Sequence, residues 1–188
     1  RSCRVMKSNN LVKIVSTIVG IVVAMFFVVL IVADPDQDIV AQSPLLGQPA
    51  PAVASETIDG AQFVLERRKG SWVVLNFFNS TCVPCINEHD LLVDFANSEA
   101  SNPNGAEIYT IINDDSSGAV RDFFNENGGD WQKVKDDNGA IAVAFGVARV
   151  PETWIIDPNG MVRLRITGEL SPGLLSEQVN KLRDGFTS

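Results

Sequence analysis

The sequence is poor in cysteine, in histidine and in positive charge, and each shortage excludes a class of function. Its 188 residues include 3 Cys and 1 His, and 15 Lys and Arg stand against 23 Asp and Glu, for a net charge of −8. Three cysteines are too few for a small secreted scaffold held together by disulfides. The excess of acid argues against nucleic-acid binding, because such proteins must neutralise phosphates.

Acidic residues are also absent from the beginning of the chain, where none occurs before Asp34. Residues 14–33, IVSTIVGIVVAMFFVVLIVA, carry no charge and would span roughly 30 Å as a helix, the thickness of a bilayer's hydrocarbon core. Four Lys and Arg precede this run and the next is Arg67, so the positive-inside rule puts residues 1–13 in the cytoplasm. We expect a single transmembrane anchor in a bacterial cell membrane. A cleaved signal peptide or a buried helix is the alternative.

The remaining chain divides into a linker and a domain. Residues 34–48 are acidic and then contain Pro and Gly, which predicts an extracytoplasmic linker. Residues 49–188 are expected to form one extracytoplasmic domain. The run MKSNN from Met6 is typical of a natural start, in which case Cys3 is not native. Cys3 would in any case lie on the cytoplasmic side, away from the other cysteines.

Within the predicted domain, apolar patterns typical of strands and helices alternate. Nearly continuous apolar runs predict buried strands, and shorter patterns predict a strand and a hairpin around Pro-Asn-Gly. The predicted strands are residues 62–65, 71–78, 107–112, 153–157 and 161–167, and the predicted helices are residues 83–97, 118–125, 141–145 and 172–186. This order predicts an α/β sandwich with a mixed sheet, parallel in the middle and antiparallel at the end.

The motif Cys82-Val-Pro-Cys85 follows a predicted buried strand and opens a predicted helix. Unpaired N–H groups at a helix start stabilise a thiolate, and the thiolate is the species that attacks a disulfide. Cys85 lies one helical turn further along, within reach of Cys82. We therefore expect Cys82 to attack a partner's disulfide and Cys85 to resolve the mixed disulfide, with this cysteine pair as the redox group and no other cofactor.

Other uses of these residues have less support. A zinc site needs four ligands, or three and a water, whereas Cys82, Cys85 and His89 supply three and no second histidine exists. A structural disulfide that closes so short a loop stabilises little. On a helix His89 would lie roughly 10.5 Å from Cys82, too far for direct proton transfer, so a partly packed surface histidine is expected. Glu88 either exchanges a proton with the thiol of Cys85 or is an exposed acid.

Four stretches together resemble a known family. The family is that of the membrane-tethered, thioredoxin-like thiol-disulfide proteins of the ResA/TlpA/CcmG group. The similar stretches are VVLNFFNSTCVPCINEH, the upstream LLGQPAPAVASETIDGAQFVL, the downstream FGVARVPETWIIDPNGMVRLRITGEL and the apolar run in its N-terminal position. The segment VPET is closest to the CcmG/DsbE branch. The resemblance extends from residue 45 to about residue 186. It implies a thioredoxin-like fold, a central mixed sheet flanked by helices, preceded by the transmembrane helix.

The resemblance also implies roles for residues outside the cysteine pair. Val150 and Pro151 match the family's cis-proline site, which presents backbone to an incoming peptide, although a trans proline entering a strand is equally compatible with the residues. Glu152 matches an acid of this branch and, with Glu88, would tune the thiols, whereas a solvated loop acid is the alternative. Asn76 stands where thioredoxin keeps a buried aspartate. Because asparagine cannot shuttle a proton at neutral pH, that role would fall to the two glutamates.

The function implied by the resemblance is reductive. It is the reduction of disulfides in apocytochrome c, or in its ligation partners, during cytochrome c maturation, with electrons from a membrane donor of the DsbD/CcdA type. Thr81 replaces the tryptophan that most relatives have before the first cysteine, which removes an aromatic flank from the partner contact. The residues themselves leave the direction of electron flow open, because related pairs span about 150 mV. The alternatives are a DsbA-like thiol oxidase and a non-enzymatic, membrane-anchored binding module.

Overall fold

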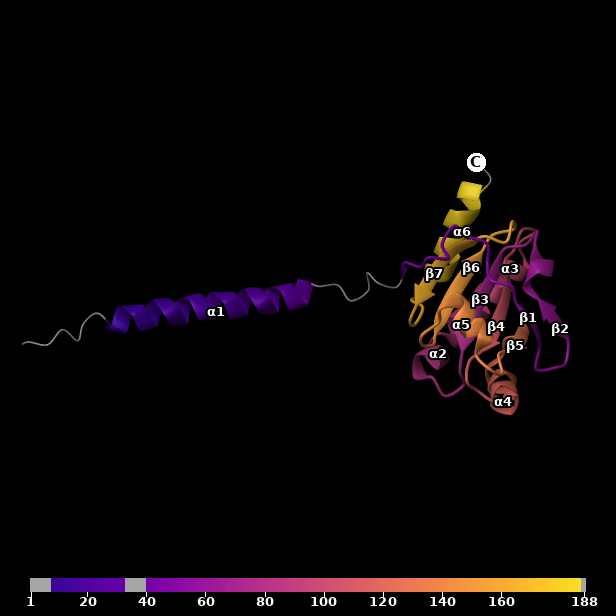
Figure 1. Cartoon of the computed structure of the whole chain (residues 1–188), viewed down its shortest axis with the longest axis horizontal. Helices are drawn as coiled ribbons and strands as arrows, with labels where there is room; N and C mark the ends of the chain where they lie inside the picture. The colour runs from indigo at the N-terminus through magenta and orange to yellow at the C-terminus, as the bar shows by residue number, and fades with distance from the viewer. Residues whose placement is uncertain (1–7, 33–39, 187–188) are drawn as a thin grey trace, which may run out of the picture. The chain divides into compact units, whose positions relative to one another are not determined.

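The computed structural model describes residues 8–32 and 40–186 (Figure 1). The chain divides into two compact units, Arg1–Gln37 and Asp38–Ser188. The first contains helix α1 (Ser8–Val32), which has no acidic residue in its first turn and no basic residue in its last. Among the described residues, no helix is both long enough and apolar enough to cross a membrane. The membrane span expected at residues 14–33 therefore stays a prediction.

The second unit is built from short strands and helices in alternation. Its strands are β1 (Ala54–Glu56), β2 (Gln62–Val64), β3 (Val73–Phe78), β4 (Glu107–Ile112), β5 (Gln132–Lys135), β6 (Glu152–Ile156) and β7 (Val162–Thr167). Its helices are the 3-10 helix η2 (Leu65–Arg68) and the α-helices α2 (Val83–Asn87), α3 (His89–Ala100), α4 (Ser117–Asn127), α5 (Ala140–Phe145) and α6 (Leu174–Phe186).

Five strands form one mixed sheet in the order β5-β4-β3-β6-β7, while β1 and β2 pair separately. Strands β3, β4 and β5 are parallel, and β6 and β7 are antiparallel to their neighbours. The predicted mixed sheet, parallel in the middle and antiparallel at the end, is therefore confirmed. All six residues of the central strand β3 are buried, as expected of a nearly continuous apolar run covered on both faces.

Side chains of β3 and β6 alternate between two cores because successive residues of a strand point to opposite faces. One core joins the sheet to the β1–β2 pair and to α5, and it includes Phe63, Phe77, Phe145 and Trp154. The other core joins the sheet to α3 and α6, and it includes Val74, Leu92, Ile155 and Val179. A third cluster packs α2 and α4 against the carboxyl ends of β3 and β4 through Phe78, Cys85, Ile112, Val120 and Phe124. Figure 1 shows α2 and α4 at one end of this unit, with the last turn of α6 at the other.

Some local predictions differ from the structure. The helix predicted over residues 83–97 is two helices, because the chain turns at Glu88 and directs that side chain inward. The strand predicted at residues 62–65 ends at Val64 and continues as η2. Strands β1 and β5 were not predicted. The sequence of β5, QKVK, carries little of the apolar signal that identifies a strand.

Residues 40–49, here called the strap, lie along β7, although most of them fall within the linker predicted at residues 34–48. The Ala41 N–H donates to the carbonyl of Arg165 at 2.9 Å, and the Val162 N–H donates to the carbonyl of Gln48 at 2.9 Å. The strap thereby covers the edge of β7, which would otherwise offer unpaired backbone groups. Residues 34–39 lie outside the described residues.

A substitution in the sheet tests this core. Ile111 on β4 is 0% exposed, whereas Val143 on α5 is 79% exposed. Ile111→Ala is expected to lower the free energy of unfolding by about 2–5 kcal/mol, because it removes buried methyl groups and leaves a cavity. Val143→Ala is expected to change it by less than about 0.5 kcal/mol. Urea denaturation of both variants measures the difference, and equal losses would contradict this assignment of the core.

Candidate active site

The loop between β3 and α2 carries the first cysteine and is fixed by one asparagine. Asn79 accepts a hydrogen bond from the Thr81 N–H at 2.8 Å, and its amide donates to the carbonyls of Asn113 and Asp114 at 3.0 and 2.8 Å. These bonds tie the loop to the segment that follows β4. Cys82 is then the N-cap of α2, and its sulfur accepts from the backbone N–H of Cys85 at 3.3 Å. The predicted position of Cys82 at a helix start is confirmed.

The two cysteines are joined by a disulfide and differ in exposure. Cys85 is 0% exposed and belongs to the cluster between α2 and α4, whereas Cys82 is partly exposed. A thiol of an incoming protein can therefore reach the sulfur of Cys82 and not that of Cys85. This asymmetry is what a pair with one attacking and one resolving thiol requires.

A proline with a cis peptide bond faces the disulfide. The Val150–Pro151 bond is cis, as the resemblance implied, and the Val150 carbonyl oxygen lies 3.6 Å from the sulfur of Cys82. In the disulfide this sulfur carries no hydrogen, so the contact is not a hydrogen bond. After reduction the Cys82 thiol can donate to the same oxygen. The segment before β6 thus lies directly against the more exposed sulfur.

Glu88 is 0% exposed, at the junction of α2 and α3. One carboxylate oxygen accepts from the amide of Asn76 on β3 at 2.9 Å, and the other accepts from the backbone N–H of Leu170 at 2.8 Å. Burial raises the pKa of Glu88 to about 7, and the two hydrogen bonds oppose that rise. Glu88 is therefore not the exposed helix acid of the alternative reading. It is a buried group that can exchange a proton near neutral pH.

Asn76 connects Glu88 to β6. It is 0% exposed, and its amide nitrogen also donates to the hydroxyl of Thr153 at 3.2 Å. Thr153 lies opposite Asn76 in the pairing of β3 with β6, which explains the contact. Neither Thr153 nor Leu170 was singled out in the sequence. A backbone N–H such as that of Leu170 leaves no signal in the residue type.

Glu152 is 2% exposed, so it is not a solvated loop acid either. Its carboxylate accepts from the guanidinium of Arg165 on β7 at 2.8 and 3.0 Å and from the indole N–H of Trp154 at 2.8 Å. Sequence reasoning missed Arg165. The available signal was its position in an alternating strand that pairs with the strand of Glu152.

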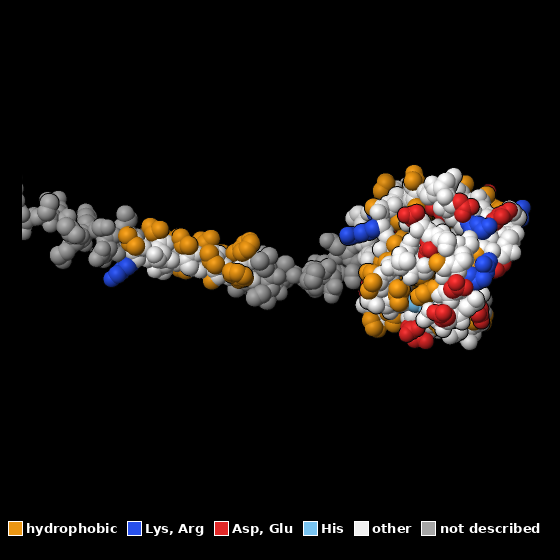
Figure 2. All heavy atoms as spheres, turned by 90° about the horizontal axis from the view of Figure 1, so that it is seen from below, with side chains coloured by type: hydrophobic (Ala, Val, Ile, Leu, Met, Phe, Trp, Pro, Cys, Tyr) orange, Lys and Arg blue, Asp and Glu red, His pale blue; other side chains and the backbone are white. Residues whose placement is uncertain are grey.

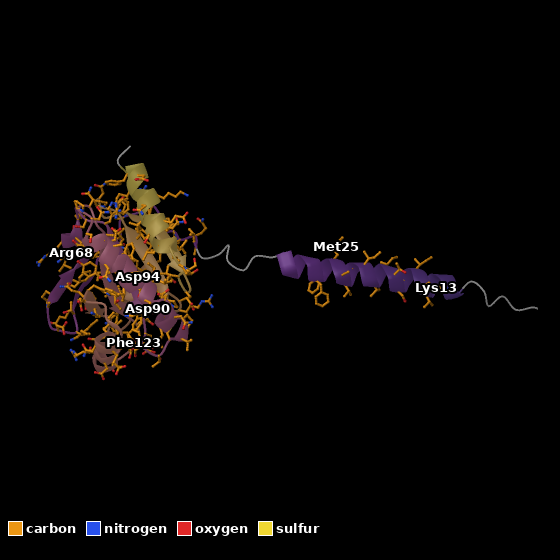
Figure 3. All side chains as sticks on the ribbon, turned by 180° about the vertical axis from the view of Figure 1, so that it is seen from behind. Lys13, Met25, Arg68, Asp90, Asp94 and Phe123 are labelled. Atoms are coloured by element: carbon orange, nitrogen blue, oxygen red, sulfur yellow. A yellow bond between two sulfur atoms is a disulfide. The ribbon has the colours of Figure 1, made fainter. Side chains whose placement is uncertain are left out.

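His89 is not the surface histidine that the sequence suggested, because it is 2% exposed. Its ring contacts Phe123 and Phe124 of α4, with centroids 4.8 and 5.0 Å away, and its Nε2 lies 3.1 Å from the carbonyl of Gly128. In the view of Figure 3, Phe123 and Asp90, the residue after His89, lie toward the same end of the second unit. Burial lowers the pKa of His89, so this histidine is a neutral packing residue at neutral pH.

The described part of the chain has no candidate metal site, and its second unit has a mixed acidic and apolar surface (Figure 2). Within residues 8–32 and 40–186, no group of three or more His, Cys, Asp or Glu side chains could hold a metal ion. On the face seen in Figure 2, acidic side chains lie scattered between hydrophobic ones over the second unit. Two residues on α2, Val83 and Ile86, are large exposed hydrophobic side chains, 64% and 42% exposed. The helix that carries the disulfide thus presents an apolar surface to a partner.

Comparisons with known proteins agree with this geometry. A model of the AhpC/TSA family matches residues 46–165. The thiol-disulfide oxidoreductase ResA of Bacillus subtilis is 29% identical over 142 residues, 76% of this chain and 78% of ResA. The thiol:disulfide interchange protein HelX of Rhodobacter capsulatus is 31% identical over 144 residues, 75% of this chain and 78% of HelX. A solved thioredoxin family protein from Chlorobium tepidum has a TM-score of 0.64 at 24% identity, covering 75% of this chain and 98% of its own, and shows the fold.

The raised pKa of Glu88 predicts how stability depends on pH. The folded-state pKa of about 7 lies above the ordinary value of 4.5. The folded chain therefore holds this proton where the unfolded chain has lost it, and the stabilisation present at low pH is lost as pH rises through 7. The loss between pH 4 and pH 8 is about 3 kcal/mol.

Glu88→Gln removes the titration and keeps the size of the side chain. The free energy of unfolding of the oxidised full chain is measured in urea for both proteins. Groups common to both cancel in the difference between them, and we expect that difference to change by about 3 kcal/mol between pH 4 and pH 8. Parallel profiles for the two proteins would contradict a buried, ionisable Glu88.

Proposed function

The chain belongs to the AhpC/TSA family and is a thiol-disulfide oxidoreductase with a thioredoxin-like fold; we propose that it reduces disulfides of apocytochrome c, or of its ligation partners, during cytochrome c maturation. The half-buried sulfur of Cys82, at a helix start and against the Val150 carbonyl, is the observation that carries this proposal. It is the point at which a partner's sulfur can enter.

In the proposed reaction, the Cys82 thiolate attacks one sulfur of the partner's disulfide, and the other sulfur leaves as a thiolate that takes up a proton. Cys85 then loses its proton and attacks Cys82, which releases the partner's second thiol. Two electrons pass from the cysteine pair to the partner, and the pair ends as the Cys82–Cys85 disulfide seen in the structure. Glu88 lies three residues past Cys85, so its carboxylate is the candidate acceptor for the proton of Cys85.

The position of Glu88 supports the reductive direction. A strongly oxidising pair such as that of DsbA has a reduced form stabilised by its environment. An ionised carboxylate near the thiols acts in the opposite way, because it repels the thiolate and thereby favours the disulfide form. Glu88, held by Asn76, would therefore lower the reduction potential of the cysteine pair. Glu152 would contribute more weakly, since Arg165 neutralises it.

The proposal includes an anchor and an electron source. Residues 14–33 carry no charge and follow four Lys and Arg, which supports a single-pass membrane anchor with the thioredoxin-like domain outside the cytoplasm. An anchored reductant in an oxidising compartment needs recharging, for which a membrane thiol carrier of the DsbD/CcdA type is suited. We expect the full chain, expressed in a bacterium, to stay with the membrane during alkaline carbonate extraction. Its release into the supernatant would contradict the anchor.

A redox titration decides the direction of electron flow. The full chain in detergent is equilibrated with dithiothreitol or glutathione buffers, and the Cys82–Cys85 pair is followed by thiol alkylation. We expect a midpoint closer to the value of thioredoxin, about −270 mV, than to that of DsbA, about −120 mV. A midpoint near the DsbA value would instead support the thiol oxidase.

The roles of the two cysteines are tested on a Cys-x-x-Cys-His peptide closed by a disulfide. Cys82→Ser is expected to abolish reduction of this peptide, because the attacking thiol is missing. Cys85→Ser is expected to accumulate a mixed disulfide with the same peptide, because the resolving thiol is missing. If Cys82→Ser restores growth or function as well as the wild type in a strain from which the gene for this protein has been deleted, the binding-module alternative is favoured.

A further inference from the structure

Arg165 lies at the centre of a contact network on the face of the sheet opposite to Glu88. Its guanidinium binds both carboxylate oxygens of Glu152, at 2.8 and 3.0 Å, and stacks over the ring of Trp154, with 5.3 Å from the guanidinium carbon to the ring centroid. The side chain of Arg165 is 18% exposed and that of Glu152 is 2% exposed. A two-point bond between nearly buried partners fixes both side chains in one geometry.

This ion pair reaches the disulfide through the backbone. Glu152 directly follows Pro151, and the carbonyl oxygen of Val150 touches the sulfur of Cys82 at 3.6 Å. The Pro151 carbonyl accepts from the Gly168 N–H at 3.0 Å, which ties the same segment to the end of β7. A side chain that holds Glu152 therefore also holds the backbone that faces the partly exposed sulfur of Cys82.

The strap provides a further contact. A third guanidinium N–H of Arg165 donates to the carbonyl of Gln42 at 3.3 Å, and the Arg165 carbonyl accepts from the Ala41 N–H. Arg165 thus joins three segments that are distant in the sequence: the strap, β7 and the segment around Pro151. Arg163, two residues earlier on β7, offers a comparison. Its pair with Asp157 is longer, at 3.7 Å, and its side chain is 43% exposed.

We propose that Arg165 is a positioning residue for polypeptide substrates: by clamping Glu152, it fixes the backbone of Val150 and Pro151 against which a disulfide-bearing polypeptide must align. The proposal deepens the proposed function, since it concerns the same site and rests on its disulfide exchange. A polypeptide aligns its own backbone along this segment, whereas a small disulfide needs only the sulfur of Cys82. Loss of the clamp therefore weakens reduction of polypeptides and spares reduction of small disulfides.

Arg165→Lys tests the clamp, because lysine keeps the charge but cannot bind both carboxylate oxygens in the same planar geometry. The reduced full chain in detergent is mixed with three oxidised probes: a Cys-x-x-Cys-His peptide, an unrelated peptide closed by one disulfide, and hydroxyethyl disulfide. Arg163→Lys is the matched control on the same strand. Thermal unfolding and the midpoint potential are measured for each protein.

We expect Arg165→Lys to lower the rate constants for both peptides by about tenfold and that for hydroxyethyl disulfide by less than about twofold, with an unchanged midpoint potential. Arg163→Lys is expected to match the wild type on all three probes. If Arg165→Lys does not fold, Glu152→Gln takes its place and is expected to show the same selective loss of peptide reduction, with at most a small rise in the midpoint potential because a weak contribution of this carboxylate is removed.

Two results would overturn the proposal: peptide rates within twofold of the wild type, or equal losses on all three probes, as a purely structural role would produce. The unrelated peptide separates this inference from the proposed function. If the wild type reduces that peptide but not the Cys-x-x-Cys-His peptide, the proposed substrate is wrong, and the effect of Arg165→Lys on the unrelated peptide still decides the role of Arg165.

Discussion

Burial of one carboxylate, that of Glu88, is the constraint on which the rest of the site depends. A carboxylate removed from water needs hydrogen-bond donors, and Glu88 finds them in the Asn76 amide and the Leu170 N–H. Glu88 is also the residue at which α2 ends, after little more than one turn, and directly after which α3 begins. That short helix has Cys82 at its start and Cys85 in the core behind it. The short helix α2 therefore connects the cysteine pair, at its start, with the buried acid, at its end.

Two buried carboxylates lie on opposite faces of the sheet, Glu88 three residues after Cys85 and Glu152 directly after Pro151. Asn76 shares its side of β3 with Val74, so it and Glu88 belong to the face covered by α3 and α6. Glu152 shares its side of β6 with Trp154 and lies on the face covered by α5. Their partners differ as well: Glu88 has neutral donors and a pKa near neutrality, whereas Glu152 is bound to a guanidinium. One acid is suited to moving a proton, and the other to holding a backbone segment.

Sequence patterns predicted the central architecture well because the buried strands β3 and β4 are long apolar runs and the Cys-x-x-Cys motif has few chemical uses. The predictions failed where local structure or burial depends on contacts between residues that are far apart in the sequence. The break falls at Glu88, whose side chain bonds to residues far away in the sequence, and β5 is a polar edge strand whose side chains carry little of the apolar signal of a strand. His89 was predicted at the surface because the aromatic rings that cover it come from α4. The same limitation applies to Arg165, whose partner is identified only once β6 and β7 are paired.

The amide of Asn76 has a consequence that a carboxylate in the same place would not have. An amide offers a donor on one edge and an acceptor on the other, and the hydroxyl of Thr153 can either accept or donate. In the orientation seen, the nitrogen serves the ionised form of Glu88, while the Asn76 oxygen is buried without a hydrogen-bond partner. Rotating the amide by half a turn, with the hydroxyl reversing its role, would give a carboxylic acid an acceptor instead. The single amide of Asn76 can thus serve both charge states of Glu88, as a donor to the carboxylate and as an acceptor from the carboxylic acid.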